Sequence, residues 1–344
     1  MRLRLLVPQV KSLPTERPTA CRWCQSPLLQ RHQTVPKKVI DTQVREAQAV
    51  RYRCTACRRT FRHYSEGVSR YRQSQRVMGL AVLLWTLGLS EWATSHVLHA
   101  LEAGIHRSSV HRDRLRAGAL LRQRRAMETG QVRVLGADET GVRIRGQAQL
   151  VGFVVDGESG KTVGVDVLVK QDGPAFRRWL ERYTRELGVE VLVTDDLNTY
   201  KPVSHQLGLP QQVCLAHVRK WVANRLRSIR GREEEQALVR QLMRELPADG
   251  GDRLLRLERR VRASPALRRL VIHLIARWPA LVYHQGRPWV PATNNRTEQA
   301  IGKSKVRFKT VRGFKSVAGA LAGIALTQWV YSGAHAHDLR ELAA

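Results

Sequence analysis

The sequence predicts an α/β protein with an all-helical insertion, preceded by a small cysteine-rich module and a helical domain. Three observations support this fold class. Short apolar segments rich in Val and Gly alternate with amphipathic helical segments between residues 130 and 216. Residues 219–290 have helical periodicity throughout and precede a basic helix. Two CxxC pairs stand near the N-terminus. A chain of 344 residues is long enough for two or three domains.

The chain is strongly basic, with a formal net charge of +30 and a pI near 11.2. A cationic surface of this size attracts phosphate backbones and gains affinity by releasing counterions. Six basic residues and no acid lie between residues 303 and 315. We therefore expect nucleic acid as the partner, although an arginine-rich protein of another kind would have a similar charge.

The sequence indicates a cytoplasmic protein. No apolar run reaches the ~18 residues that span a bilayer, and Pro8 interrupts the opening MRLRLLVPQV too early for a signal peptide. We expect no membrane partner and an association with the nucleoid. In a reducing compartment, paired cysteines are better explained as metal ligands than as disulfides.

Four cysteines form two pairs in the first 66 residues: Cys21, Cys24, Cys54 and Cys57. The CxxC spacing lets both thiolates of a pair reach one ion, and four thiolates complete a tetrahedral zinc site. Residues 1–66 are therefore predicted to form a zinc-ribbon-like module with a structural Zn²⁺. His32 or His63 could replace one cysteine as a ligand.

Residues 67–129 are predicted to form a helix-turn-helix domain. Ser90 can cap one helix, Gly104 can supply the turn, and Ser108 can cap the next helix. A second helix in this arrangement enters the major groove of DNA. The residues expected to face base edges and phosphates are Ser109, His111, Arg112 and Arg116. A helical hairpin with a solvated basic face is the alternative.

The central region has the order of strands and helices typical of an RNase H-like fold, expected over residues 130–335. Three strands at 132–140, 149–156 and 161–169 precede a helix at 174–187, a strand at 189–195, a helical segment at Tyr200 and a strand at 211–216. In this fold the ends of the first and fourth strands lie side by side. Asp138 and Asp195 should therefore meet.

A third acid, Glu298, is expected in the first turn of a helix that begins at PATNNRTEQ. Thr293 or Asn294 can cap this helix, and Gly302 would allow it to approach the strands closely. Basic residues on and after the helix are expected to bind phosphate: Lys305, Arg307, Lys309 and Arg312.

Three carboxylates ~5 Å apart repel one another by roughly 3 kcal/mol per pair at an effective dielectric near 20. Cations must offset this repulsion, and oxygen ligands favour Mg²⁺ or Mn²⁺ over Zn²⁺. Two such ions could activate a water or a 3′-hydroxyl and stabilise the leaving oxygen of an in-line displacement. Each acid alone could instead be a turn residue, a cap or an ordinary helix acid, and Glu139 and Asp196 compete as ligands.

Four motifs resemble those of bacterial insertion-sequence transposases of the DDE type: GADET, VTDDLNTYKPV, QVCLAHVRK and TNNRTEQAIGKSKVRFKTVRGF. The resemblance implies that Asp138, Asp195 and Glu298 bind catalytic metals and that Asn295 and Lys305 support them. It also implies binding of double-stranded DNA, as terminal inverted repeats and target, by a homo-oligomer. A non-catalytic regulator derived from a transposase, and an RNase H-like nuclease or resolvase, are the alternatives.

The spacing of Cys214 and His217 is compatible with a metal, but two ligands cannot complete a tetrahedral site. We favour a buried Cys214 and a His217 that orients a backbone or DNA phosphate.

Asp195 and Glu298 are 103 positions apart, whereas a strand, one or two helices and loops of usual length need only ~35 to 40 residues between them. Residues 219–290 are therefore predicted to be a helical insertion. Four tryptophans are expected in the core, with stacking on bases as the alternative: Trp85, Trp92, Trp278 and Trp289.

Overall fold

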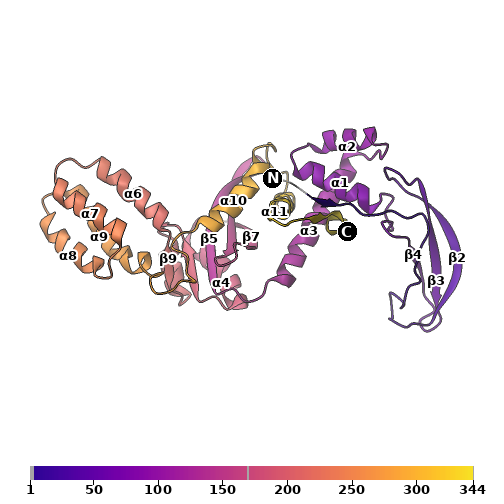
Figure 1. Ribbon diagram of the computed structural model, residues 1–344, viewed down its shortest axis with the longest axis horizontal. Coiled ribbons are helices and arrows are strands. Elements are labelled where there is room, and N and C mark those ends of the chain that lie inside the picture. The colour runs from indigo at the N-terminus through magenta and orange to yellow at the C-terminus, as the bar shows by residue number, and fades with distance from the viewer. Residues whose placement is uncertain (1–3, 169, 344) are drawn as a thin grey trace. The chain divides into compact units, whose positions relative to one another are not determined.

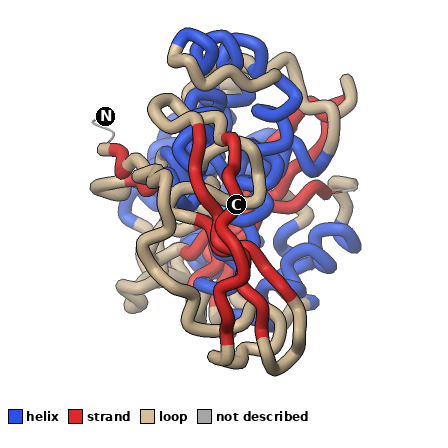
Figure 2. The backbone as a smooth tube through the Cα atoms, turned by 90° about the vertical axis from the view of Figure 1, so that its right-hand side faces the viewer, coloured by secondary structure: helices blue, strands red, loops and turns tan. Residues whose placement is uncertain are grey.

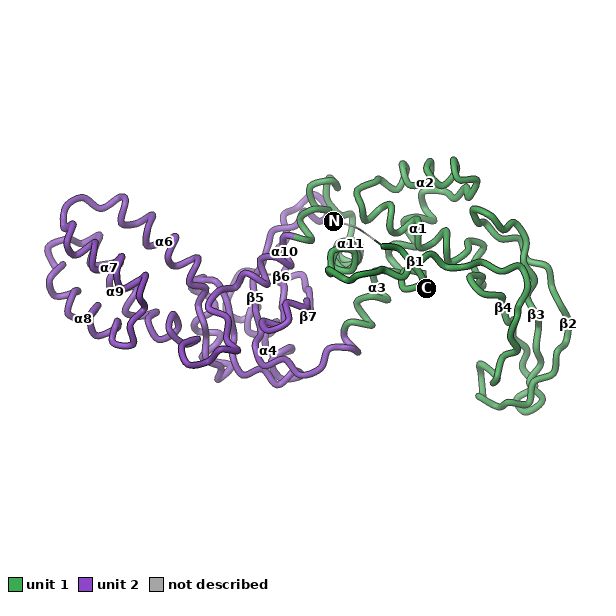
Figure 3. The backbone as a smooth tube through the Cα atoms, viewed as in Figure 1, with its two compact units in different colours: residues 1–125, 303–344 green, residues 126–302 purple. Residues whose placement is uncertain are grey.

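The computed structural model describes residues 4–168 and 170–343. The chain folds as two compact units, residues 1–125 with 303–344 and residues 126–302 (Figure 3). The boundaries fall within helix α3 (Arg107–Glu128) and helix α10 (Asn295–Phe308). None of the helices in the described ranges is long and apolar enough to cross a bilayer.

The cysteine-rich module of the first unit is a three-stranded antiparallel sheet, drawn as long red strands in Figure 2. Its strands are β2 (Leu29–Lys38), β3 (Glu46–Cys54) and β4 (Thr60–Tyr64). A small core of Leu29, Val50 and Tyr52 packs beside the buried Cys21 and Cys54. So little apolar surface cannot stabilise a sheet by itself, which is why a metal site is expected here.

Three helices follow: α1 (Gln75–Thr86), α2 (Glu91–Ala100) and α3. Ser90 caps α2 as predicted, because its hydroxyl accepts a hydrogen bond from the Ala93 amide. The prediction that Ser108 caps the next helix, α3, was wrong. Helix α3 already begins at Arg107, and the His106 imidazole accepts the hydrogen bond from the Ser108 amide instead.

The turn between α2 and α3 also differs from the prediction. Glu102, not Gly104, has the left-handed backbone, with φ 57°. Gly104 is needed for a different reason, since a Cβ there would lie 2.6 Å from the His99 ring. Two of the tryptophans also separate: Trp85 is buried, whereas Trp92 is 61% exposed and lies against His96, so the prediction of a core position for Trp92 was wrong.

The C-terminal segment completes the first unit. Helix α11 (Val317–Val330) is apolar on all sides and almost entirely buried. Gly118 of α3 lets it approach closely, since a Cβ there would lie 2.5 Å from Ala322. Strand β10 (His337–Asp338) then pairs in parallel with β1 (Leu5–Leu6), and a short 3₁₀ helix, η1 (Leu339–Leu342), follows.

The second unit is built on a five-stranded sheet with spatial order β7-β6-β5-β8-β9; β5, β7 and β9 are labelled in Figure 1. The strands are β5 (Val134–Ile144), β6 (Gln147–Asp156), β7 (Thr162–Leu168), β8 (Val191–Thr194) and β9 (Gln211–Val213). The first three pair antiparallel, whereas β5, β8 and β9 are parallel. The predicted end of the third strand, residue 169, lies outside the described residues.

Two helices connect these strands, α4 (Gly173–Leu187) and α5 (Tyr200–Gln206). Residues Phe176, Trp179 and Leu180 of α4 pack with Leu135 and Leu192 of the sheet. Three antiparallel strands followed by two parallel strands with helical crossovers is the RNase H-like arrangement, so the predicted fold class is confirmed.

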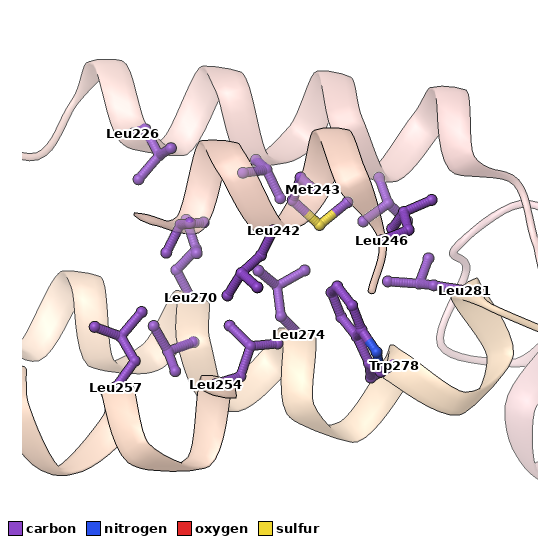
Figure 4. Close-up of a cluster of buried hydrophobic side chains, with 14 of the residues drawn as sticks. Leu226, Leu242, Met243, Leu246, Leu254, Leu257, Leu270, Leu274, Trp278 and Leu281 are labelled. Atoms are coloured by element: carbon purple, nitrogen blue, oxygen red, sulfur yellow. The ribbon is translucent and has the colours of Figure 1, made fainter. Parts of the chain in front are cut away.

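The insertion is a helical bundle with its own core. It consists of α6 (Leu215–Arg227), α7 (Glu233–Glu245), α8 (Gly250–Arg260) and α9 (Pro265–Leu281). Figure 4 shows the Trp278 side chain among leucines of these helices. Its 3% exposure fits the core interpretation and leaves no face for a base. Trp289 is partly buried against the strand core, with the Arg133 guanidinium 4.1 Å from its ring centre.

Candidate active site

Two acids lie at the same edge of the second unit's sheet. Ala137 of β5 is the register partner of Thr194 of β8, so Asp138 and Asp195 both come directly after a matched pair. The paired positions of neighbouring parallel strands lie about 5 Å apart. Both carboxylates are partly buried at this edge. The sheet register therefore brings together two acids that are 57 positions apart.

Helix α10 carries the third acid onto this edge. The Asn294 side chain donates a hydrogen bond of 2.9 Å to the Ala137 carbonyl, next to Asp138. Thr297 lies directly over Gly136, where a Cβ would come within 2.4 Å of the Thr297 hydroxyl. Glu298 is the next residue, and its amide donates to the Asn294 carbonyl. The start of α10 is thus held on β5 one helical turn from Glu298.

Sequence reasoning placed this close approach at the wrong glycine. A Cβ on Gly302 would meet no described atom within 4 Å, whereas Gly136 has no room for one. Asn295, for which the resemblance implies a supporting role, is exposed, whereas its neighbour Asn294 is only 2% exposed. Adjacent asparagines cannot be distinguished from sequence, because only the helix phase decides which side chain faces the strands.

The electrostatics of this edge are those of crowded acids. Burial, together with repulsion from Asp195, Glu139 and Glu298, raises the pKa of Asp138 from 3.8 to about 7. Burial also raises the pKa of Asp195, with contributions from Asp196 and Glu298. The mutual repulsion identifies these carboxylates as near neighbours whose charged forms are disfavoured without a cation.

The two competing acids have other partners. Glu139 accepts a hydrogen bond of 2.6 Å from the buried Tyr200 hydroxyl and another from Gln171. Asp196 is paired with Arg277 and with His273, both on α9 of the insertion. These contacts occupy the Asp196 carboxylate and leave Asp195 as the acid that follows the strand position matched to Ala137.

Glu298 lies between the two aspartates and a second group. Its Oε1 is 3.7 Å from His217 Nε2, and donor atoms of Cys214, His217 and Glu298 all lie within 4.8 Å of one another. Asp138, Asp195 and Glu298 do not form so tight a set in the described parts of the chain. Among the described residues, the tight set of donor atoms that includes Glu298 is therefore the one with Cys214 and His217.

The basic residues after Glu298 lie in different surroundings. Lys305, Lys309 and Arg312 are exposed, as a phosphate contact requires. Arg307 is only 2% exposed, and its guanidinium donates to the carbonyls of Gly88 and Leu89. It also stacks over Trp85 at 4.2 Å. The prediction that Arg307 binds DNA was therefore wrong, because its charged group is enclosed within the first unit.

The predicted recognition face of α3 is partly engaged in intramolecular contacts. His111 bonds to Glu91 at 2.7 Å, and Arg116 pairs with Asp113 and lies over the Tyr71 ring. Arg112 is exposed and donates to the Ser109 hydroxyl. Of the four residues, Arg112 has the most accessible charge.

The four cysteines of the first unit converge, with all four sulfur atoms within 4.8 Å of one another. Hydrogen bonds from the backbone, mainly the Cys57 amide, lower the pKa of Cys54 from 9.0 to about 7. Four thiols so placed fit a single tetrahedral Zn²⁺ as a structural site. His32 and His63 are not part of this cluster.

Part of the chain matches the model of a known protein family. Residues 221–322 match the model of the transposase IS66 family. The chain resembles the IS66-family transposases. The match confirms the predicted resemblance to insertion-sequence transposases of the DDE type, and its range includes Glu298 but not Asp138 or Asp195. No curated protein matches the sequence.

Solved structures of transposases and integrases are also similar to this chain at low identity. The catalytic core of BIV integrase is 12% identical, with 61% of this chain and 92% of that chain covered and a TM-score of 0.30. The Drosophila P element transposase strand transfer complex is 13% identical, with 77% and 80% covered and a TM-score of 0.33. The Mos1 transposase catalytic domain with Raltegravir and Mg is 13% identical, with 51% and 94% covered and a TM-score of 0.20. At these values the fold assignment of this transposase-like chain rests on its own strand order.

Proposed function

We propose that the protein is a DDE-type DNA transposase that binds the ends of its element, cuts DNA strands and joins the 3′-hydroxyls to target DNA. The observation that carries the proposal is the meeting of Asp138 and Asp195 at one sheet edge, with Glu298 delivered to it by α10. The family match over residues 221–322 supports the same assignment.

The residues at this edge fit a divalent cation site. Asp138 has a pKa of about 7 because burial and neighbouring acids disfavour its charged form, and a bound cation would remove that penalty. Asp138 and Asp195 would hold the ions from the sheet, and Glu298 would close the site from the helix. Two Mg²⁺ or Mn²⁺ ions at such a site would activate the attacking water or 3′-hydroxyl and stabilise the leaving oxygen.

Other side chains of the protein position the acids. Asn294 and Thr297 fix the start of α10 on β5, and the Tyr200 hydroxyl donates a hydrogen bond that holds the Glu139 carboxylate. DNA would be bound through the net charge of +30, with α3, the cysteine-rich module and the exposed Lys305, Lys309 and Arg312 as the proposed contacts. A homo-oligomer on two element ends is proposed by analogy with the family alone.

The test is a strand-transfer assay with duplex DNA that ends in the element's own inverted repeats, in Mg²⁺. The native chain should cut its ends and join them to a target plasmid. Asp138→Asn, Asp195→Asn and Glu298→Gln should each reduce both products by about 100-fold or more, since even outer-shell changes at metal sites cost 10 to 100-fold. Glu190→Gln removes an exposed acid of the same unit and should keep full activity.

Three results would contradict the proposal. DNA binding without cleavage by the native chain would favour a regulator, and cleavage without joining would favour a nuclease. Cleavage that persists in Asp138→Asn would separate the activity from this sheet edge.

A further inference from the structure

The row of residues at the sheet edge continues beyond the two aspartates. Thr194 of β8 is the register partner of Val213 of β9, as it is of Ala137 on the other side. Cys214 is therefore the next member of the row that contains Asp138 and Asp195. Its amide donates to the Thr194 carbonyl at 2.8 Å, and its side chain is fully buried.

Helix α6 starts directly after Cys214 and places His217 on the same face, three residues later. His217 Nε2 is 3.7 Å from Glu298 Oε1. His217 Nδ1 is shielded from solvent and has no hydrogen-bond partner among the described residues. An unpartnered buried ring nitrogen is destabilising, and a metal ion that binds the ring through Nδ1 would remove that penalty.

We propose that Cys214, His217 and Glu298 form a second metal site, specific for Zn²⁺ and separate from the four-cysteine cluster. Thiolate, imidazole and carboxylate are the three ligand types of zinc sites, and three protein ligands leave one position open to water. Mg²⁺ does not take a thiolate ligand. Mg²⁺ would therefore bind at Asp138 and Asp195, and Zn²⁺ at Cys214 and His217, on the same edge of the sheet.

The geometry needs only a small contraction. Zinc bonds of about 2.0–2.3 Å imply separations between tetrahedral ligand atoms of about 3.3–3.8 Å. The donor atoms of the three residues already lie within 4.8 Å of one another. Rotation of the Glu298 side chain, which is partly exposed, can supply the remaining ångström, while the buried Cys214 stays fixed.

Sharing of Glu298 makes the site inhibitory, and this part of the inference rests on the proposed function. A carboxylate held by zinc beside His217 cannot at the same time close the ion site at Asp138 and Asp195. Zn²⁺ should therefore inhibit strand cleavage by withholding the third acid, and additional Mg²⁺ should compete only weakly against a thiolate-bound ion.

Metal binding tests the site without reference to activity. The full-length protein is loaded with one equivalent of Zn²⁺ for the four cysteines and then titrated with Co²⁺, whose thiolate complexes absorb in the near ultraviolet. The native chain should bind one further ion with this absorption. Cys214→Ala should lose the absorption, and His217→Ala should bind the second ion about 100-fold more weakly.

The matched control is Asp138→Asn, which removes an acid from the same edge and should keep the cobalt absorption. Each variant should retain its first zinc and its far-ultraviolet circular dichroism, so that misfolding is recognised. An unchanged absorption in Cys214→Ala, or no thiolate absorption from added Co²⁺ in the native chain, would overturn the proposal.

The second measurement is DNA cleavage. For each variant, the rate with added Zn²⁺ is divided by the rate without it. Zinc should inhibit the native chain and should inhibit Cys214→Ala about 100-fold less effectively. If the native chain binds the second cobalt but never cuts DNA, the assigned function fails and the zinc site stands. If it cuts DNA but added Co²⁺ gives no thiolate absorption, the zinc site fails and the function stands.

Discussion

Replacement of Asp138 by Asn should stabilise the metal-free protein while removing its activity. The wild-type carboxylate is partly buried beside Asp195 and Glu298, and its pKa is raised from 3.8 to about 7. An acid whose pKa is higher in the folded state binds protons more tightly when folded. The protein should therefore lose stability as the pH rises and this group ionises. An amide of the same shape never carries that charge.

The expected magnitude follows from the pKa change. A rise of about three units, at 1.36 kcal/mol per unit, corresponds to roughly 4 kcal/mol. The sign sets the pH window. Below the unfolded pKa near 3.8 the group is protonated in both states and there is no penalty. The penalty grows as the pH rises and is complete above about 7. Partial exposure of Asp138 to water makes this figure an upper value.

The assay is urea unfolding between pH 4 and pH 8 with divalent ions other than the structural zinc removed. The difference in free energy of unfolding between Asp138→Asn and wild type should be near zero at pH 4 and should grow toward pH 7. Glu190→Gln, at an exposed acid of the same unit, serves as the charge-matched control and should show no such growth. Comparison of variants cancels the pH dependence of the groups that do not interact with Asp138.

Addition of Mg²⁺ completes the test, because a cation that binds the ionised acids should stabilise wild type and leave Asp138→Asn unchanged. The reasoning is refuted if Asp138→Asn is no more stable than wild type at pH 8 without metal. It is equally refuted if Mg²⁺ stabilises both proteins to the same extent, since the ion would then bind elsewhere.

Three further predictions concern other parts of the chain. Cys54→Ser should remove the structural zinc, measured by metal analysis, and expose the module of β2–β4 to limited proteolysis, because its apolar core is small. Asn294→Ala should destabilise the protein by about 1–3 kcal/mol through the unpaired Ala137 carbonyl, and it should reduce cleavage more than an Asn295→Ala control. Arg307→Met should destabilise by about 1–3 kcal/mol for each carbonyl left without its donor, measured by thermal unfolding, since it removes a buried donor from two carbonyls. It should leave the salt dependence of DNA binding unchanged, whereas Lys309→Met should lower that slope by about one.

The order of strands was predictable because each strand carries its own signal. Glycine-rich turns separate the apolar segments of β5, β6 and β7, and the pattern changes to alternating helices before β8. The cysteine spacing likewise indicated a four-thiolate cluster before any geometry was known. Local propensity and spacing are short-range properties, and these predictions needed nothing more.

The errors arose where a side chain's surroundings come from distant segments. Arg307 has the same local sequence context as Lys305 and Lys309, yet only Arg307 meets the Gly88 and Leu89 carbonyls. Gly302 and Gly136 both looked suited to a close contact, but the register of α10 against β5 places Thr297 over Gly136 alone.

The sequence by itself determined the residue types for the chemistry: three acids, two cysteine pairs, a Cys-x2-His pair and a large positive charge. Only the tertiary structure decided which of them share a site. The register of β5, β8 and β9 aligns Asp138, Asp195 and Cys214 in one row, and α10 brings Glu298 within reach of His217. Hydrogen-bonded pairing between strands fixes such distances, and no local pattern along the chain contains that information.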